Sequence, residues 1–170
     1  MTLLTTLNTL GLGSPTAPLR CRRGLWRNLL HDLHRRGGNA KESGAFLLGE
    51  TVNKIRRIEH YLLFDAIDPN ALTGGIDFDG SKMDQVWDEC RRRNLQVVAD
   101  VHTHPRGYGQ SSIDRDNPMM PRRGHIAIIV PDFARKPVGP GKIGMYELVG
   151  PSAWTDHSRA GSTFFSLEWF

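Results

Sequence analysis

The sequence is poor in cysteine, because its 170 residues include two, Cys21 and Cys90. Two cysteines cannot build the disulfide framework of a small secreted domain. Both lie next to arginines, which would lower the pKa of a thiol, but a pair of reduced cytosolic thiols is the simpler interpretation. The cysteine content therefore gives no support to a disulfide-rich secreted protein.

Long apolar runs and a large charge excess are also missing. No apolar run approaches the ~20 residues that a membrane-spanning helix needs. Lys and Arg together number 22 and Asp and Glu 18, which gives a net charge of +4. This weak basic excess suits an acidic partner, but no basic patch interleaved with aromatic residues accompanies it. We therefore expect a protein that binds neither a membrane nor a nucleic acid.

The first 24 residues differ from the rest of the chain. Their leucines are interrupted by Thr, Asn and Gly, and no basic residue precedes them. A secretory signal requires a charged start and a continuous apolar stretch. We interpret residues 1–24 as a partly ordered leader on a cytoplasmic protein. Residues 25–170 form a single domain in this interpretation, in line with ~100–200 residues per domain.

Hydrophobic periodicity predicts two helices and five strands. One helix starts near Leu25 and ends at Gly37-Gly38, and a second covers residues 81–94, with apolar residues at helical spacing. Short apolar or β-branched runs predict the strands, at residues 44–49, 55–64, 95–101, 125–130 and 144–149. Strands that alternate with helices predict an α/β or α+β fold, with one central mixed sheet flanked by helices.

The most informative segment is residues 100–118, DVHTHPRGYGQSSIDRDNP. On a strand, His102 and His104 share one face and Thr103 takes the other, where we expect it to pack. Ser111 or Ser112 can cap a short helix that carries Asp114 in its first turn. Two histidines and a carboxylate are a common ligand set for catalytic zinc, with one position left for water. The remaining histidines lack such neighbours, and we interpret them as ordinary.

These residues resemble the signature of the JAMM metalloproteases, the catalytic MPN or JAB domains. Members of this family use one zinc ion to cut peptide or isopeptide bonds after ubiquitin or a ubiquitin-like protein, on a cytidine-deaminase-like fold. The resemblance covers residues 25–150 and implies that His102, His104 and Asp114 are the metal ligands. It also implies that Glu42, in the segment ESGAFLLG, is the catalytic acid.

Two departures from the family pattern leave alternatives open. The first glycine of ESGAFLLG falls one place early, with Ala45 where the family has glycine, and Glu50 is a competing candidate for the acid. Nine residues separate His104 from Asp114, where ten is the commonest spacing. Asp116 is the alternative ligand, although no serine stands three residues before it.

The predicted chemistry follows from this assignment. Zinc lowers the pKa of a bound water from ~15.7 toward ~7, and Glu42 would act as general base and return the proton to the departing amine. Ser111 would donate a hydrogen bond to the oxyanion. We expect an extended tail that ends in small residues to pair with a sheet edge near the metal. Residues 65–78 and 106–110 are the candidate walls of the site.

Four functions compete at this point. The first is an isopeptidase that deconjugates a ubiquitin-like protein or trims its precursor, with the activating and conjugating enzymes of the same system as partners. The resemblance implies a bacterial setting for it, in antiviral defence. The second is a JAB-type zinc peptidase or amidase on unrelated substrates. The third is an MPN scaffold without activity, against which the complete residue set argues, and the fourth is nucleic-acid binding.

Overall fold

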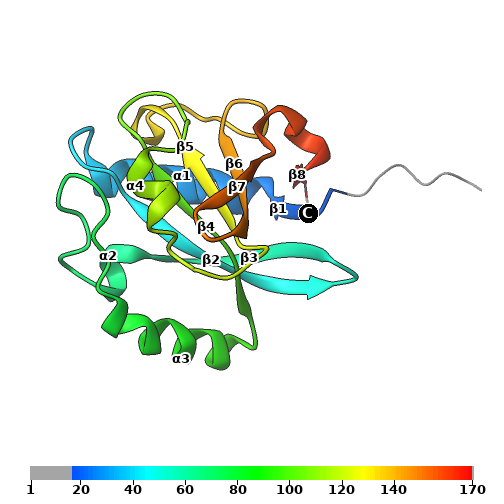
Figure 1. Ribbon diagram of the computed structural model, residues 1–170, viewed down its shortest axis with the longest axis horizontal. Coiled ribbons are helices and arrows are strands. Elements are labelled where there is room, and N and C mark those ends of the chain that lie inside the picture. The colour runs from blue at the N-terminus through cyan, green and yellow to red at the C-terminus, as the bar shows by residue number, and fades with distance from the viewer. Residues whose placement is uncertain (1–16, 170) are drawn as a thin grey trace, which may run out of the picture.

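Eight strands form one curled mixed sheet, in the order β7-β6-β5-β4-β2-β3-β1-β8 (Figure 1). The computed structural model describes residues 17–169. The strands are β1 (Leu19–Arg22), β2 (Gly44–Val52), β3 (Ile55–Leu63), β4 (Gln96–Thr103), β5 (Ile126–Val130), β6 (Gly144–Gly150), β7 (Ala153–Asp156) and β8 (Phe165–Glu168). The helices are α1 (Arg23–Gly37), α2 (Phe64–Ile67), α3 (Met83–Arg93) and α4 (Ser112–Asp116). Short 3-10 turns cover Gly80–Lys82, Asp132–Ala134 and Ser158–Thr163.

The centre of the sheet brings distant parts of the chain together. Strands β4 and β5 are parallel, and β2 runs antiparallel to β4, with Gly44 paired to His102. The carboxyl ends of β4 and β5 therefore lie at the same edge of the sheet as the beginning of β2. This edge is where the sequence places its two paired histidines and its upstream glutamate.

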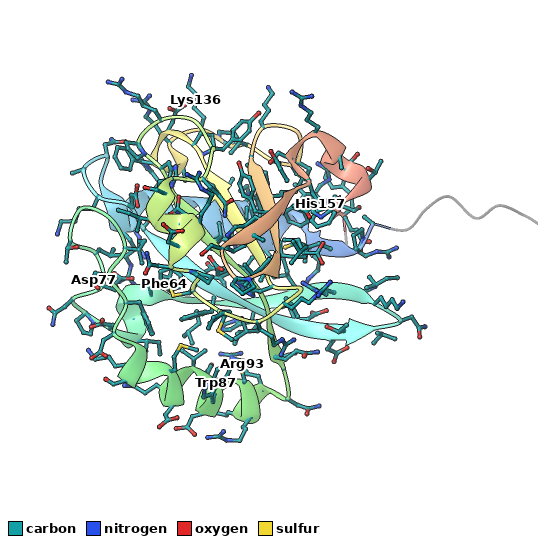
Figure 2. The ribbon with its side chains drawn as sticks, viewed as in Figure 1. Phe64, Asp77, Trp87, Arg93, Lys136 and His157 are labelled. Carbon is teal, nitrogen blue, oxygen red and sulfur yellow. The ribbon has the colours of Figure 1, made fainter. Side chains whose placement is uncertain are left out.

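Alternating side chains of β2 supply both faces of the sheet. Ala45 and Leu47 belong to the core beneath α1, whereas Phe46 and Leu48 belong to a second core beneath α3. Figure 1 shows α1 and α3 on opposite sides of the sheet. Trp87, labelled in Figure 2, extends from α3 toward this second core. The continuous apolar character of β2 follows from burial on both faces.

The two longer helices end as the sequence predicts. At Gly38 the backbone takes a φ of 59°, and its N–H donates to the carbonyl oxygen of His34. Asn94 ends α3 in the same left-handed conformation, with a φ of 56°. Glycine and asparagine tolerate this conformation better than other residues do, so they stop a helix at a defined position.

The predicted helices and five strands are confirmed, with ends shifted by a few residues. Strand β4 extends to Thr103, and α2 directly follows β3, starting at Phe64, which was predicted as the last strand residue. Strands β1, β7 and β8 were not predicted, because each has four residues and too few positions to show a period. Strand β1 lies between β3 and β8 and falls within residues 1–24, the leader that was expected to be partly ordered. Residues 1–16 of the predicted leader lie outside the described residues.

No helix among residues 17–169 has both the length and the apolar composition that crossing a bilayer requires.

Candidate metal centre

Three segments of the chain converge at the carboxyl end of β4. His102 and His104 come from the end of β4 and share a face, as their spacing predicts, and their Nε2 atoms are 3.0 Å apart. Asp114 comes from α4, and its two carboxylate oxygens lie 3.3 Å from Nε2 of His102 and of His104. Glu42 precedes β2, and its carboxylate and the two imidazoles offer ligand atoms within 4.8 Å of one another. The four predicted residues therefore meet at one place.

A capping box at the start of α4 fixes the orientation of Asp114. The Asp114 backbone N–H donates to Ser111 Oγ at 3.1 Å, and the Ser111 N–H donates to Asp114 Oδ2 at 2.6 Å. The serine three residues before the aspartate is therefore the N-cap, one of the two caps that the sequence allowed. Its hydroxyl accepts this bond and keeps its own hydrogen for another acceptor.

The segment that carries Glu42 is held by hydrogen bonds on both sides, of which those of Ser43 are buried. The Glu42 N–H donates to the carbonyl oxygen of Gly74 at 2.8 Å. The next residue, Ser43, donates its N–H to Thr103 Oγ1 at 2.9 Å and its hydroxyl to the carbonyl oxygen of Leu33 at 2.6 Å. Thr103 was predicted to pack, and it does face away from the histidines, but its hydroxyl also ties the glutamate segment to β4. Sequence spacing alone could not reveal this bond, because its partners are 60 residues apart.

The electrostatics of the site suit a base beside a cation. Burial raises the pKa of Glu42, and the nearby histidines offset this only in part. Burial disfavours protonated His102, but the hydrogen bond to Asp114 and its charge outweigh burial and raise the pKa of this imidazole. Burial likewise opposes the charge on Asp114, yet hydrogen bonds from His102 and His104 leave its pKa well below the usual range. The aspartate is therefore held as an anion by the two histidines, and the glutamate takes up a proton more readily than an exposed carboxylate.

The spacing of the donor atoms fits a tetrahedral zinc ion. Ligand bonds of ~2.0–2.1 Å in a tetrahedron place neighbouring ligand atoms about 3.3–3.4 Å apart. Nε2 of His102 and Nε2 of His104 are 3.0 Å apart, and each lies 3.3 Å from a different carboxylate oxygen of Asp114, distances close to that value. Two imidazoles and one carboxylate are also a ligand set that catalytic zinc sites use. The Glu42 carboxylate lies within 4.8 Å of ligand atoms of both histidines, close enough to contact an ion held there or a water molecule bound to it.

A cavity of about 340 Å³ opens beside the histidines. Its walls include Ile76 from the segment before α3, Met119 from the loop after α4, and Trp154 from β7. The indole N–H of Trp154 donates to the carbonyl oxygen of Arg115 at 3.1 Å, which holds β7 against the end of α4. The predicted wall 65–78 therefore contributes, the predicted wall 106–110 contributes Gln110, and β7 was not foreseen.

A comparison with known protein families shows to which family the chain belongs. The model of the prokaryotic homologs of the JAB domain matches residues 24–138. The chain belongs to the prokaryotic JAB-domain family. Two solved structures are similar in fold to this chain. Protein DSY2949 from Desulfitobacterium hafniense has a TM-score of 0.64 and 15% identity, covering 88% of this chain and 92% of that one. A protein from Salinibacter ruber (strain DSM 13855) has a TM-score of 0.55 and 16% identity, covering 81% and 88%.

Within this JAB domain, the two competing acids lie elsewhere. Glu50 is exposed near the carboxyl end of β2, opposite Arg57 of β3 in the sheet register. It therefore lies at the other end of the strand from Glu42. Asp116 is exposed at the last position of α4, two residues beyond the capping box. Neither residue lines the cavity beside the histidines. Glu42 and Asp114 therefore remain the predicted acid and ligand.

One histidine that was interpreted as ordinary belongs to the surroundings of the site. His125 is buried, and its Nε2 lies 2.5 Å from Oδ1 of the buried Asp100. Asp100 lines the same cavity as His102. The alternation of strand residues would have placed Asp100 on the histidine face, but its partner is 25 residues further along the chain.

Proposed function

We propose that this JAB domain is a zinc-dependent peptidase or isopeptidase that cleaves the bond after the C-terminal tail of a ubiquitin-like protein. The observation that carries the proposal is the convergence of the Glu42 carboxylate with two imidazoles that share Asp114. A scaffold would have no need to gather these partly buried ionisable groups at one place, because burying ionisable groups costs stability. The proposal includes a cytoplasmic setting and the activating and conjugating enzymes of the same system as partners.

His102, His104 and Asp114 would hold the ion, and the capping box keeps the aspartate turned toward the histidines. Zinc supplies Lewis acidity when it is bound, since it polarises a carbonyl oxygen and brings the pKa of water toward ~7. The protein contributes a fixed ligand geometry, which reduces the reorganisation that the reaction requires.

Glu42 performs the proton transfers. Its raised pKa lets the carboxylate take a proton from the attacking water at an Oε atom. A carbon–oxygen bond forms at the scissile carbonyl as the carbon–nitrogen bond breaks, and the same Oε gives the proton to the leaving amine. Ser111 can donate its free hydroxyl hydrogen to the carbonyl oxygen as negative charge develops there, a contribution of ~3–4 kcal/mol in other hydrolases.

The test separates metal binding from cleavage. We expect metal analysis to find about one zinc per chain, the count of a single three-ligand site. His102→Ala should lose zinc and activity, whereas Glu42→Gln should keep zinc and lose activity. Glu50→Gln is the matched control, because Glu50 is exposed and outside the cavity, and it should keep both. Full activity in Glu42→Gln would remove the proposed base.

A panel of substrates identifies the class of bond. Fusions of ubiquitin-like proteins that end in Gly-Gly should be cut directly after this tail. Cleavage of unrelated peptides alone would replace the modifier-specific function with that of a general JAB-type peptidase. A zinc-loaded protein that cuts neither would be a scaffold.

A further inference from the structure

The inner part of the cavity contains a carboxylate that the proposed chemistry does not use. Asp100 is 3% exposed and His125 is 6% exposed. Among residues 17–169, the bond between His125 Nε2 and Asp100 Oδ1 is the one hydrogen bond to this carboxylate. A carboxylate has about four acceptor positions, so Asp100 keeps acceptor capacity after His125 has been satisfied. In the described part of the chain, the second oxygen of Asp100 is not among the fully buried side-chain atoms that lack a partner, so this oxygen is accessible from the cavity and can accept a hydrogen bond from a donor bound there.

Asp100 lies close to the reacting atoms. It precedes His102 by two residues on β4 and shares its face, so the two Cα atoms are about 7 Å apart along the strand. Both residues line the cavity of about 340 Å³. A group bound to Asp100 would therefore be within one side-chain length of a carbonyl held at His102.

The cavity favours a positive charge. Its lining residues, all within the described part of the chain, include three carboxylates, Glu42, Asp100 and Asp114, and neither Lys nor Arg. A divalent ion would offset two of these charges and leave one. The same cavity is also lined by apolar side chains, among them Met119 and Trp154, which suits the aliphatic part of a long basic side chain.

We propose that Asp100, oriented by His125, is a recognition group for a Lys or Arg side chain on the leaving-group segment of the substrate. The inference rests on the proposed function, because it assumes a scissile bond at the histidines. The tail before that bond ends in small residues, which cannot fill a cavity of this size. The side chain that enters it therefore comes from the residue after the bond.

The experiment uses fusions of one ubiquitin-like protein in which Gly-Gly is followed by Lys, Met or Glu. Met matches the length of the Lys stem without its charge. A charge-assisted hydrogen bond should make kcat/KM for the Lys fusion roughly 10- to 100-fold higher than for the Met fusion. Asp100→Asn should abolish this ratio. Asp116→Asn, the same change at an exposed position outside the cavity, should keep the ratio.

A binding measurement makes the result independent of turnover. Glu42→Gln should bind an uncut Gly-Gly-Lys peptide roughly tenfold or more tightly than the Gly-Gly-Met peptide in a calorimetric titration. Equal cleavage of the Lys and Met fusions by the unmodified protein would overturn the Asp100 proposal and leave the proposed function standing. An Asp100→Asn protein that loses zinc and slows equally on both fusions would also overturn it, since Asp100 would then act through His102. If no fusion is cut, the proposed function fails, and the Asp100 proposal, which assumes its scissile bond, fails with it.

Discussion

Gly44 is the position at which a single methyl group should disable the proposed catalysis while leaving every proposed metal ligand in the chain. It begins β2, pairs with His102 of β4 and follows Glu42 by two residues. A Cβ atom at this position would lie 2.6 Å from the Val101 carbonyl oxygen and would overlap the ring of Phe64. Real Cβ atoms essentially never approach within 3.0 Å, so the backbone of β2 must move away from β4 by at least 0.4 Å, the difference of 3.0 and 2.6.

This displacement has two measurable consequences. Inserting a methyl group into a packed region costs about 1–3 kcal/mol of the free energy of unfolding. The shift also moves Glu42 relative to the histidines. Because a misplacement of about 1 Å can cost ~100-fold in rate, we expect Gly44→Ala to lower kcat at least about tenfold. Zinc affinity should change little, since His102, His104 and Asp114 do not belong to β2.

Three assays on one preparation check the prediction: cleavage of a Gly-Gly fusion, zinc content, and chemical denaturation. Gly37→Ala is the matched control, because a Cβ there would lie 3.6 Å from Ser43 Oγ, an ordinary contact, and alanine in a helix gains about 0.5–1 kcal/mol over glycine. A Gly44→Ala protein with an unchanged rate and unchanged stability would refute the close packing of β2 against β4 at the site.

Four further outcomes follow from individual side chains. Thr103→Val leaves a buried N–H without its acceptor and should cost about 1–3 kcal/mol in denaturation, whereas Thr103→Ser should recover most of this loss. Ser111→Ala removes an N-cap and should lower the free energy of unfolding by about 1 kcal/mol. If the same substitution lowers kcat by less than about tenfold, Ser111 is a helix cap and has no oxyanion role. Burial raises the pKa of Cys21 to about 12, so thiol reagents at pH 8 should label it after unfolding and not before. Burial raises the folded-state pKa of Glu42, so in metal-free protein the Glu42 charge lowers the free energy of unfolding once the pH exceeds the unfolded-state pKa of this carboxyl. Glu42→Gln should therefore increase the free energy of unfolding at pH 7, and it should have no such effect below the unfolded-state pKa.

The spacing of nearby residues in the sequence was sufficient to predict the arrangement of the two histidines and of the Ser111–Asp114 turn. The strand period placed His102 and His104 on one face, and the three-residue interval from Ser111 to Asp114 is that of the capping box in the structure. Both patterns depend on bonds and torsions within a few residues, so the sequence expresses them directly. The role of Glu42 came from the resemblance to a family. Its position beside the histidines depends on the pairing of β2 with β4, which no local period encodes.

The features that the sequence did not reveal share a physical cause. The Thr103 bond to the backbone of Ser43 joins residues 60 positions apart, and the His125 bond to Asp100 joins residues 25 positions apart. Long-range hydrogen bonds have no periodic signature. Edge strands such as β7 are equally hidden, because four residues support neither a hydrophobic period nor an alternation. The contribution of Trp154 to the cavity therefore could not be predicted from the sequence.

The short spacing between His104 and Asp114 is accommodated because both ends of the intervening loop are anchored. The His104 N–H donates to the Val130 carbonyl oxygen, which fixes the start of the loop at the end of β5. In the middle of the loop, the Tyr108 carbonyl oxygen accepts from the Tyr146 hydroxyl at 2.9 Å. The capping box at Ser111 then sets the orientation of Asp114 independently of the loop. A residue can be lost between such anchors at little cost, since loop closure depends weakly on length, and the aspartate still reaches both imidazoles.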